Sequence, residues 1–132
     1  AMGLTLTQAF QIHFVIGILF CLPVFTSGIS GFLETITNGQ LTDPDMFTLH
    51  LAGVDFSKNM MIALQCYAGT KMDSAAQKLL AQTFVAMCLM CVAVLFIHPT
   101  APIQELIPPL LYLTIVPSTY VLAMTSGKGK AA

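Results

Sequence analysis

The sequence predicts an all-α integral membrane protein: one domain over residues 1–132, built as a bundle of four transmembrane helices. Only 8% of the 132 residues are charged and 56% are hydrophobic, whereas ordinary soluble domains carry about 25% charged residues. The mean hydropathy is +0.82. Apart from histidines, no ionisable charge occurs in residues 1–33, 79–104 or 106–127. Each run exceeds the roughly 20 residues that cross about 30 Å of hydrocarbon.

The charged residues separate onto two sides when the chain crosses four times. One side carries four lysines and one aspartate, a net charge of about +3: Lys71, Asp73, Lys78, Lys128 and Lys130. The other side carries five acids besides Lys58: Glu34, Asp43, Asp45, Asp55 and Glu105. Because retained loops keep lysine, we expect both termini on the positive side, facing cytoplasm, stroma or matrix. The alternative lays the second helix flat on the interface, which leaves three crossings and puts the N-terminus on the acidic side.

The first helix is expected over residues 7–32. Pro23 predicts a kink, and Gly28 and Gly31 are expected to let a neighbouring helix approach closely. This apolar stretch is too long for a cleaved signal peptide and has no basic residues before it, so we expect no cleavable signal. A start at Ala1 fits a processed precursor, such as one that has lost an organellar targeting segment, and it also fits a residue added before Met2 or a sequence that is only part of a longer chain.

The second helix is expected over residues 44–69, after the polar loop 35–42. Asp43 followed by Pro44 predicts an N-cap and a proline in the first turn, and Gly69 predicts the C-cap.

The third and fourth helices are expected over residues 75–98 and 104–126. Ser74 and Gln77 have the spacing of a capping box for the third helix. In the fourth, Pro117 frees a backbone carbonyl that the hydroxyl of Ser118 or Thr119 is expected to help satisfy.

Three histidines are candidate cofactor ligands. His13 lies about two turns into the first helix from the basic side, whereas His50 and His98 fall near the acidic side. A bis-histidine haem needs two imidazoles at one depth, so His13 has no evident partner for haem. Chlorophyll needs one axial ligand on magnesium, and His13 with Gln11 nearby can supply it. The alternative for each histidine is a hydrogen bond to a neighbouring backbone or side-chain group.

Asp55 and Lys58 are the ionised residues expected at membrane depth, where each costs about 2.5 to 3.5 kcal/mol near the bilayer centre. At spacing i, i+3 they share a helix face and can neutralise one another. We therefore predict a structural ion pair. The alternative is a proton or substrate relay that also uses His50 and Asn59.

The four cysteines all fall in apolar helices: Cys21, Cys66, Cys88 and Cys91. There a thiol behaves as a small hydrophobic group, and packing is the expected role. Cys88 and Cys91 have CxxC spacing, so the chain resembles in outline the four-helix membrane thiol oxidoreductases that reduce quinones. It departs from them because this pair lies well inside a helix and no second pair occurs in a loop.

Other chemistries lack a matching pattern. No zinc-site spacing, no glycine-rich nucleotide loop and no nucleophilic triad is present, and five lysines without arginine do not predict nucleic acid binding. We expect no metal site, no nucleotide and no nucleic acid partner. The chain lacks tryptophan, and three tyrosines are left as interfacial anchors: Tyr67, Tyr112 and Tyr120.

A four-helix membrane protein of this size with short loops resembles the accessory subunits of photosystems and respiratory complexes, and also DoxX-like small membrane proteins. The first resemblance implies a non-enzymatic subunit that contacts other membrane subunits and holds lipid, chlorophyll or carotenoid. It implies an organellar membrane, with the thylakoid favoured and the mitochondrial inner membrane second. The alternative function is a small carrier or oxidoreductase that uses Asp55, Lys58 and His50, or Cys88 and Cys91.

Overall fold

The structure is a computed structural model that describes residues 3–37, 39, 41, 43–97 and 107–126. It contains four α-helices: α1 (Leu6–Ile36), α2 (Met46–Gly69), α3 (Ser74–Ile97) and α4 (Ile107–Ser126). The all-α expectation is confirmed. Among the described residues, three segments are long and apolar enough to cross a membrane: Leu6–Thr35, Ser74–Ile97 and Pro109–Ser126. Helix α2, which carries the ion pair, is not among them.

Helix α1 begins one residue before the predicted start because of a capping box. Thr5 Oγ1 accepts a hydrogen bond from the Gln8 backbone N–H at 3.2 Å, and Gln8 Oε1 accepts one from the Thr5 N–H at 2.9 Å. These bonds satisfy two backbone donors that a helix start leaves free. The helix continues to Ile36, four residues beyond the expected end.

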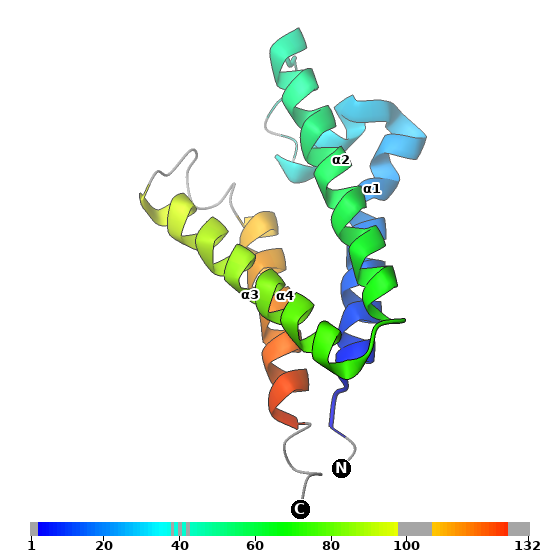
Figure 1. Cartoon of the computed structure of the whole chain (residues 1–132). Helices are drawn as coiled ribbons and strands as arrows, with labels where there is room; N and C mark the ends of the chain where they lie inside the picture. The colour runs from blue at the N-terminus through cyan, green and yellow to red at the C-terminus, as the bar shows by residue number, and fades with distance from the viewer. Residues whose placement is uncertain (1–2, 38, 40, 42, 98–106, 127–132) are drawn as a thin grey trace, which may run out of the picture.

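Gly28 interrupts α1, with φ 69° and ψ −167° inside an otherwise helical segment. The kink predicted at Pro23 therefore lies five residues too early, and beyond Gly28 the chain turns away from the axis of the first part of the helix (Figure 1). The predicted close approach of a neighbouring helix is also wrong at these glycines. A Cβ at Gly28 would meet nothing within 4 Å, and one at Gly31 would meet Ser27 of its own helix.

We expect Gly28→Ala to lower the free energy of unfolding in mild detergent by about 1 to 2 kcal/mol, because only glycine adopts this backbone conformation without strain. Gly53→Ala is the matched control, since Gly53 lies inside α2 with open space around its Cβ position. It should be neutral or slightly stabilising. Equal losses in both variants would contradict a special role for the backbone of Gly28.

Helices α1 and α2 pack antiparallel along their length. At one end, the Gly69 Cα lies against the Phe10 ring, where an added Cβ would come within 3.0 Å. At the other, the Phe32 and Phe56 rings are 5.8 Å apart between centroids. Between them, a Cβ at Gly17 would lie 3.1 Å from the Ala63 Cβ. The structure therefore joins α2 to α1 as a helical hairpin and does not set it apart as an isolated surface helix.

One end of the bundle collects the starts of α1 and α3 and the ends of α2 and α4. The Gln77 side-chain amide donates to the Gly69 carbonyl at 2.9 Å and contacts Thr7 Oγ1 at 3.1 Å, so it joins three helices. Gly3 lies beside Ser126, the last residue of α4. Toward the opposite end, the α1/α2 and α3/α4 hairpins diverge (Figure 1). Successive helices therefore run in alternating directions along the bundle.

Two helix starts are capped by a different residue from the one predicted. Asp45, two residues after Asp43, caps α2, and its Oδ1 accepts from the Thr48 N–H at 2.7 Å. Asp73 caps α3 in place of Ser74, and its Oδ1 accepts from the Ala75 and Ala76 N–H groups at 2.9 Å each. A carboxylate at the N-cap also interacts favourably with the helix dipole.

The cap of α2 predicts a pH dependence. The Asp45 carboxylate accepts hydrogen bonds from the Thr48 hydroxyl and, with a smaller effect, from the Thr48 backbone N–H, and these bonds hold the pKa of the Asp45 carboxyl below its ordinary value. Because the folded-state pKa is lowered, the cap stabilises fully above the unfolded-state pKa of about 4 and is lost as pH falls through the folded value. We expect the protection of the amides in the first turn of α2, relative to their intrinsic exchange rates at the same pH, to fall in acid. Asp45→Asn caps without titrating, so a loss of protection in acid that persists in this variant would contradict the assignment.

The buried core lies mainly near the end of the bundle where α1 and α3 begin and α2 and α4 end. Its residues come from all four helices: Ala9, Phe10, Ile62, Cys66, Ala81, Phe84, Cys88, Val116, Tyr120 and Ala123. A smaller cluster of Phe32, Leu33 and Ala52 fixes the part of α1 after Gly28 to α2. The larger core encloses the polar group described next.

Candidate functional site: the buried His13 cluster

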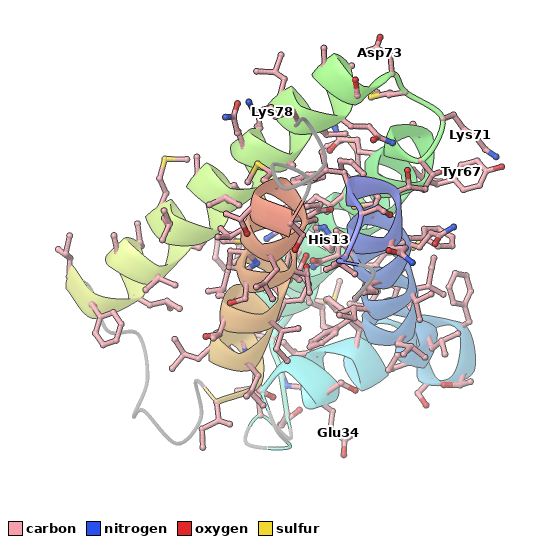
Figure 2. All side chains as sticks on the ribbon, turned by 90° about the horizontal axis from the view of Figure 1, so that it is seen from below. His13, Glu34, Tyr67, Lys71, Asp73 and Lys78 are labelled. Atoms are coloured by element: carbon pink, nitrogen blue, oxygen red, sulfur yellow. The ribbon has the colours of Figure 1, made fainter. Side chains whose placement is uncertain are left out.

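A polar cluster of His13, Cys66, Tyr112 and Tyr120 lies inside the bundle. His13 of α1 is completely buried, and so are Cys66 of α2 and Tyr120 of α4. The Tyr120 hydroxyl lies 2.8 Å from His13 Nδ1, and the Tyr112 hydroxyl lies 2.6 Å from Nε2. Cys66 Sγ is 3.1 Å from Nδ1 and 3.7 Å from the Tyr120 hydroxyl. Figure 2 shows His13 between α1 and α4.

Aromatic rings surround this cluster, which we call the His13 cluster. The Phe84 ring of α3 meets the His13 ring edge to face, with 5.1 Å between centroids. The Phe10 ring meets the Tyr120 ring in the same way at 5.1 Å. All four helices thus contribute to the site, and its polar atoms are held in apolar surroundings where an unpaired donor or acceptor is costly.

The hydrogen-bond pattern favours one tautomer of His13. A neutral imidazole has one donor and one acceptor nitrogen. With the proton on Nδ1, the ring donates to Tyr120, the Tyr120 hydroxyl donates to Cys66 Sγ, and the Tyr112 hydroxyl donates to Nε2. With the proton on Nε2, the Tyr112 hydroxyl needs another acceptor, and the residues that the structure describes provide none. We therefore assign the proton to Nδ1.

The cluster does not fit the predicted role of His13 as a pigment ligand. An axial ligand to magnesium needs a free ring nitrogen, and both nitrogens of His13 have phenol partners within 2.8 Å. The alternative, a histidine bonded to neighbouring side chains, describes the geometry. Among the described residues, no buried side-chain nitrogen or oxygen lacks a hydrogen-bond partner, so the cluster is a closed link between α1, α2 and α4.

The other predicted cofactor ligands lie apart from His13. Gln11 is exposed, while His13 two residues later is buried, so the two side chains leave α1 in different directions. His50 is exposed near the start of α2. His98 lies outside the described residues. The structure therefore does not bring these residues together as one binding site.

Asp55 and Lys58 form an ion pair on the exposed side of α2, with side-chain exposures of 36% and 57%. Asn59 Nδ2 donates to the Asp55 backbone carbonyl at 2.8 Å and to Oδ2 at 3.2 Å. The hydrogen bonds of the described residues do not include His50 in this group, so its geometry is that of a local ion pair rather than a relay from His50.

The cysteines provide no exposed dithiol. Cys88 belongs to the buried core, while Cys91 one turn later is exposed, and both are free thiols. Within the described part of the chain, no three histidine, cysteine, aspartate or glutamate side chains are grouped so that they could hold a metal ion.

The sequence analysis missed the tyrosines as partners of His13. Tyr112 and Tyr120 were expected at the membrane interface, but Tyr120 is fully buried and the Tyr112 hydroxyl points to His13. Their spacing of eight residues, close to two turns, places them on nearby faces of α4 and is the one local signal of a shared partner. The hydroxyls predicted to compensate for Pro117 bond elsewhere: Ser118 donates to the Thr114 carbonyl and Thr119 to that of Val116.

Comparisons with protein families, with curated proteins and with solved structures find no match to this chain. The resemblance to accessory subunits therefore stays one of layout.

Proposed function

We propose that the chain is a non-enzymatic accessory subunit of a multi-subunit membrane complex, held in the bilayer by four crossings. The main support is that most of the apolar surface of the helices is not buried within the bundle. In each of the three apolar spans, only 17% of the most apolar window is buried. Large apolar side chains such as Phe25, Phe47 and Phe96 are more than 60% exposed. Lipid or neighbouring subunits must cover this surface.

The crossing by α2 is part of this proposal. Helix α2 has 24 residues, about 36 Å at about 1.5 Å per residue, which is enough to cross about 30 Å of hydrocarbon. It lies antiparallel against α1, itself an apolar span, and this pairing favours a crossing over a position flat on the interface.

The geometry of His13 removes the reason to prefer chlorophyll as the ligand and the thylakoid as the membrane. The preference for chlorophyll and the thylakoid rested on His13, whose nitrogens are both bonded. The chain is therefore expected to bind lipid and partner subunits. The thylakoid membrane and the mitochondrial inner membrane fit such an energy-transducing complex equally well.

A carrier or oxidoreductase is the weaker alternative. The Asp55–Lys58 pair lies on the outside of α2, Cys88 and Cys91 differ in exposure, and the His13 cluster is closed. None of these groups both is open to a substrate and has its reactive side chains placed together.

The test is mild detergent extraction of the native membrane, followed by size separation with absorption spectra across the fractions. We expect the chain to migrate with a large particle, and the particle's absorption will identify a pigment or haem complex. The accessory-subunit proposal would be overturned if the chain migrated as a small, colourless particle and still did so after the detergent was exchanged for lipid nanodiscs.

A further inference from the structure

Helix α2 presents an exposed stripe with the spacing of a helix–helix seam. Its members are separated alternately by four and three residues: Phe47, Leu51, Val54, Lys58, Met61 and Gln65. All six are exposed. Alternation of four and three places residues along one face of a helix and is the spacing of the a and d positions in paired helices. We call this face the α2 outer stripe.

Lys58 of the α2 outer stripe and its ion-pair partner Asp55, which lies beside the stripe, carry charge at membrane depth. Gly69, the last residue of α2, lies against Phe10 near the end of the bundle where α1 and α3 begin. Lys58 and Asp55 lie about 16 and 21 Å along α2 from Gly69, at about 1.5 Å per residue. With α2 crossing about 30 Å of hydrocarbon, this position is inside the apolar layer. A lipid-facing ion pair there is unfavourable, and such residues usually face protein or water.

We propose that a second copy of this chain covers the α2 outer stripe, with Lys58 of each copy also reaching Asp55 of the other. Two copies in one membrane share their orientation, so a two-fold axis along the membrane normal makes their α2 helices parallel, as a heptad seam requires. Under that symmetry each residue lies level with its own copy, so Lys58 of one copy reaches Asp55 of the other about one turn along the helix. The four charges sum to zero, and the charged residues fix the register of a mainly apolar contact.

Nothing in the fold obstructs this pairing. In the part of the chain that the structure describes, α2 packs mainly on α1, and α4 also packs on α1, so the outer side of α2 is left uncovered. The inference rests on the proposed crossing by α2 and adds the identity of one partner.

The experiment is cysteine cross-linking of the full chain in its native membrane, in a Cys91→Ser background. Met61→Cys reports on the stripe. Leu64→Cys is its matched control on the same helix, because Met61 and Leu64 are 57% and 59% exposed but differ by about 60° around the helix, at about 100° per residue. We expect an oxidant to give a band at twice the mass for Met61→Cys and not for Leu64→Cys.

A charge exchange tests the pairing independently. Asp55→Lys and Lys58→Asp should each lose the Met61→Cys cross-link, and coexpression of the two variants should restore it as a mixed pair. Equal cross-linking at both cysteine positions, or a Met61→Cys product that contains a different protein, overturns the pairing with a second copy.

Labelling separates this failure from failure of the proposed crossing. Met61→Cys should resist a membrane-impermeant maleimide applied from either side. Labelling would place α2 in water and overturn both the crossing and the pairing. Protection without any cross-link would leave the crossing intact and overturn the pairing alone.

Discussion

Replacing His13 with leucine is expected to lower the free energy of unfolding by about 2 to 5 kcal/mol, because the buried Tyr120 hydroxyl and the half-buried Tyr112 hydroxyl both lose their histidine partner. The Tyr112 and Tyr120 hydroxyls lie within 2.8 Å of the His13 ring nitrogens. Each unpaired buried group costs about 1 to 3 kcal/mol. Denaturant unfolding in mild detergent, followed by circular dichroism, measures the loss.

The control removes every polar group of the His13 cluster except the Cys66 thiol. In the triple variant His13→Leu, Tyr112→Phe and Tyr120→Phe, no hydroxyl is left to satisfy, and replacing both partners by apolar groups of similar shape can be nearly neutral. We therefore expect the triple variant to be more stable than His13→Leu alone. A triple variant that loses the sum of the single losses would contradict a closed hydrogen-bond cluster and indicate that the side chains act independently.

Tyr120→Phe alone should cost less, about 0.5 to 2 kcal/mol. In membrane proteins a single interhelical hydrogen bond contributes about 0.6 kcal/mol on average. The loss is limited further because His13 Nδ1 keeps Cys66 Sγ at 3.1 Å as a second contact. The order of the losses, His13→Leu above Tyr120→Phe, is therefore the specific expectation.

The number of helices followed from composition, because an uncharged run long enough to cross a bilayer has few other stable conformations. Helix starts were less predictable. Two aspartates precede α2, and both have the oxygen that an N-cap needs, so the choice of Asp45 over Asp43 depends on local geometry that residue type does not specify.

The His13 cluster could not be predicted for a different reason. Its partners lie 53, 99 and 107 residues away in the sequence. Because these helices are apolar all round, no amphipathic pattern indicates which face of each turns inward. The facing of α1 and α4 is set by packing of Phe10, Phe84 and Tyr120, which is a property of the assembled bundle.

Function is less accessible for the same physical reason. A membrane helix exposes apolar residues to lipid and to partner subunits alike, so the exposed surface of α3 and α4 supports a covered position in a membrane complex without marking which face a partner occupies. The ion pair on α2 does distinguish faces, since charge in hydrocarbon is unfavourable. Asp55 and Lys58 therefore carry more information about partners than the many exposed leucines.

Phe10→Ala is expected to lower the free energy of unfolding by about 2 to 4 kcal/mol. Phe10 is completely buried. Its ring contacts Gly69 of α2, Phe84 of α3 and Tyr120 of α4. Truncating a buried phenylalanine costs about 3 to 5 kcal/mol in soluble proteins. The part due to transfer from water is smaller between membrane helices, where van der Waals packing is the main attraction. The same unfolding measurement in mild detergent reports this loss.

Phe25→Ala is the matched control, because Phe25 is on the same helix and 69% exposed. Its ring meets the Phe56 ring edge to face, with 6.2 Å between centroids, and is otherwise exposed, so the change should stay within about 1 kcal/mol. Because Phe10 is buried and Phe25 is exposed, the loss for Phe10→Ala should clearly exceed the loss for Phe25→Ala. Similar losses would mean that both rings are buried in protein, and a larger loss for Phe25→Ala would require the inward face of α1 to be reassigned. Because Phe10 packs against Tyr120, which bonds His13, that reassignment would also remove the basis for the His13 cluster.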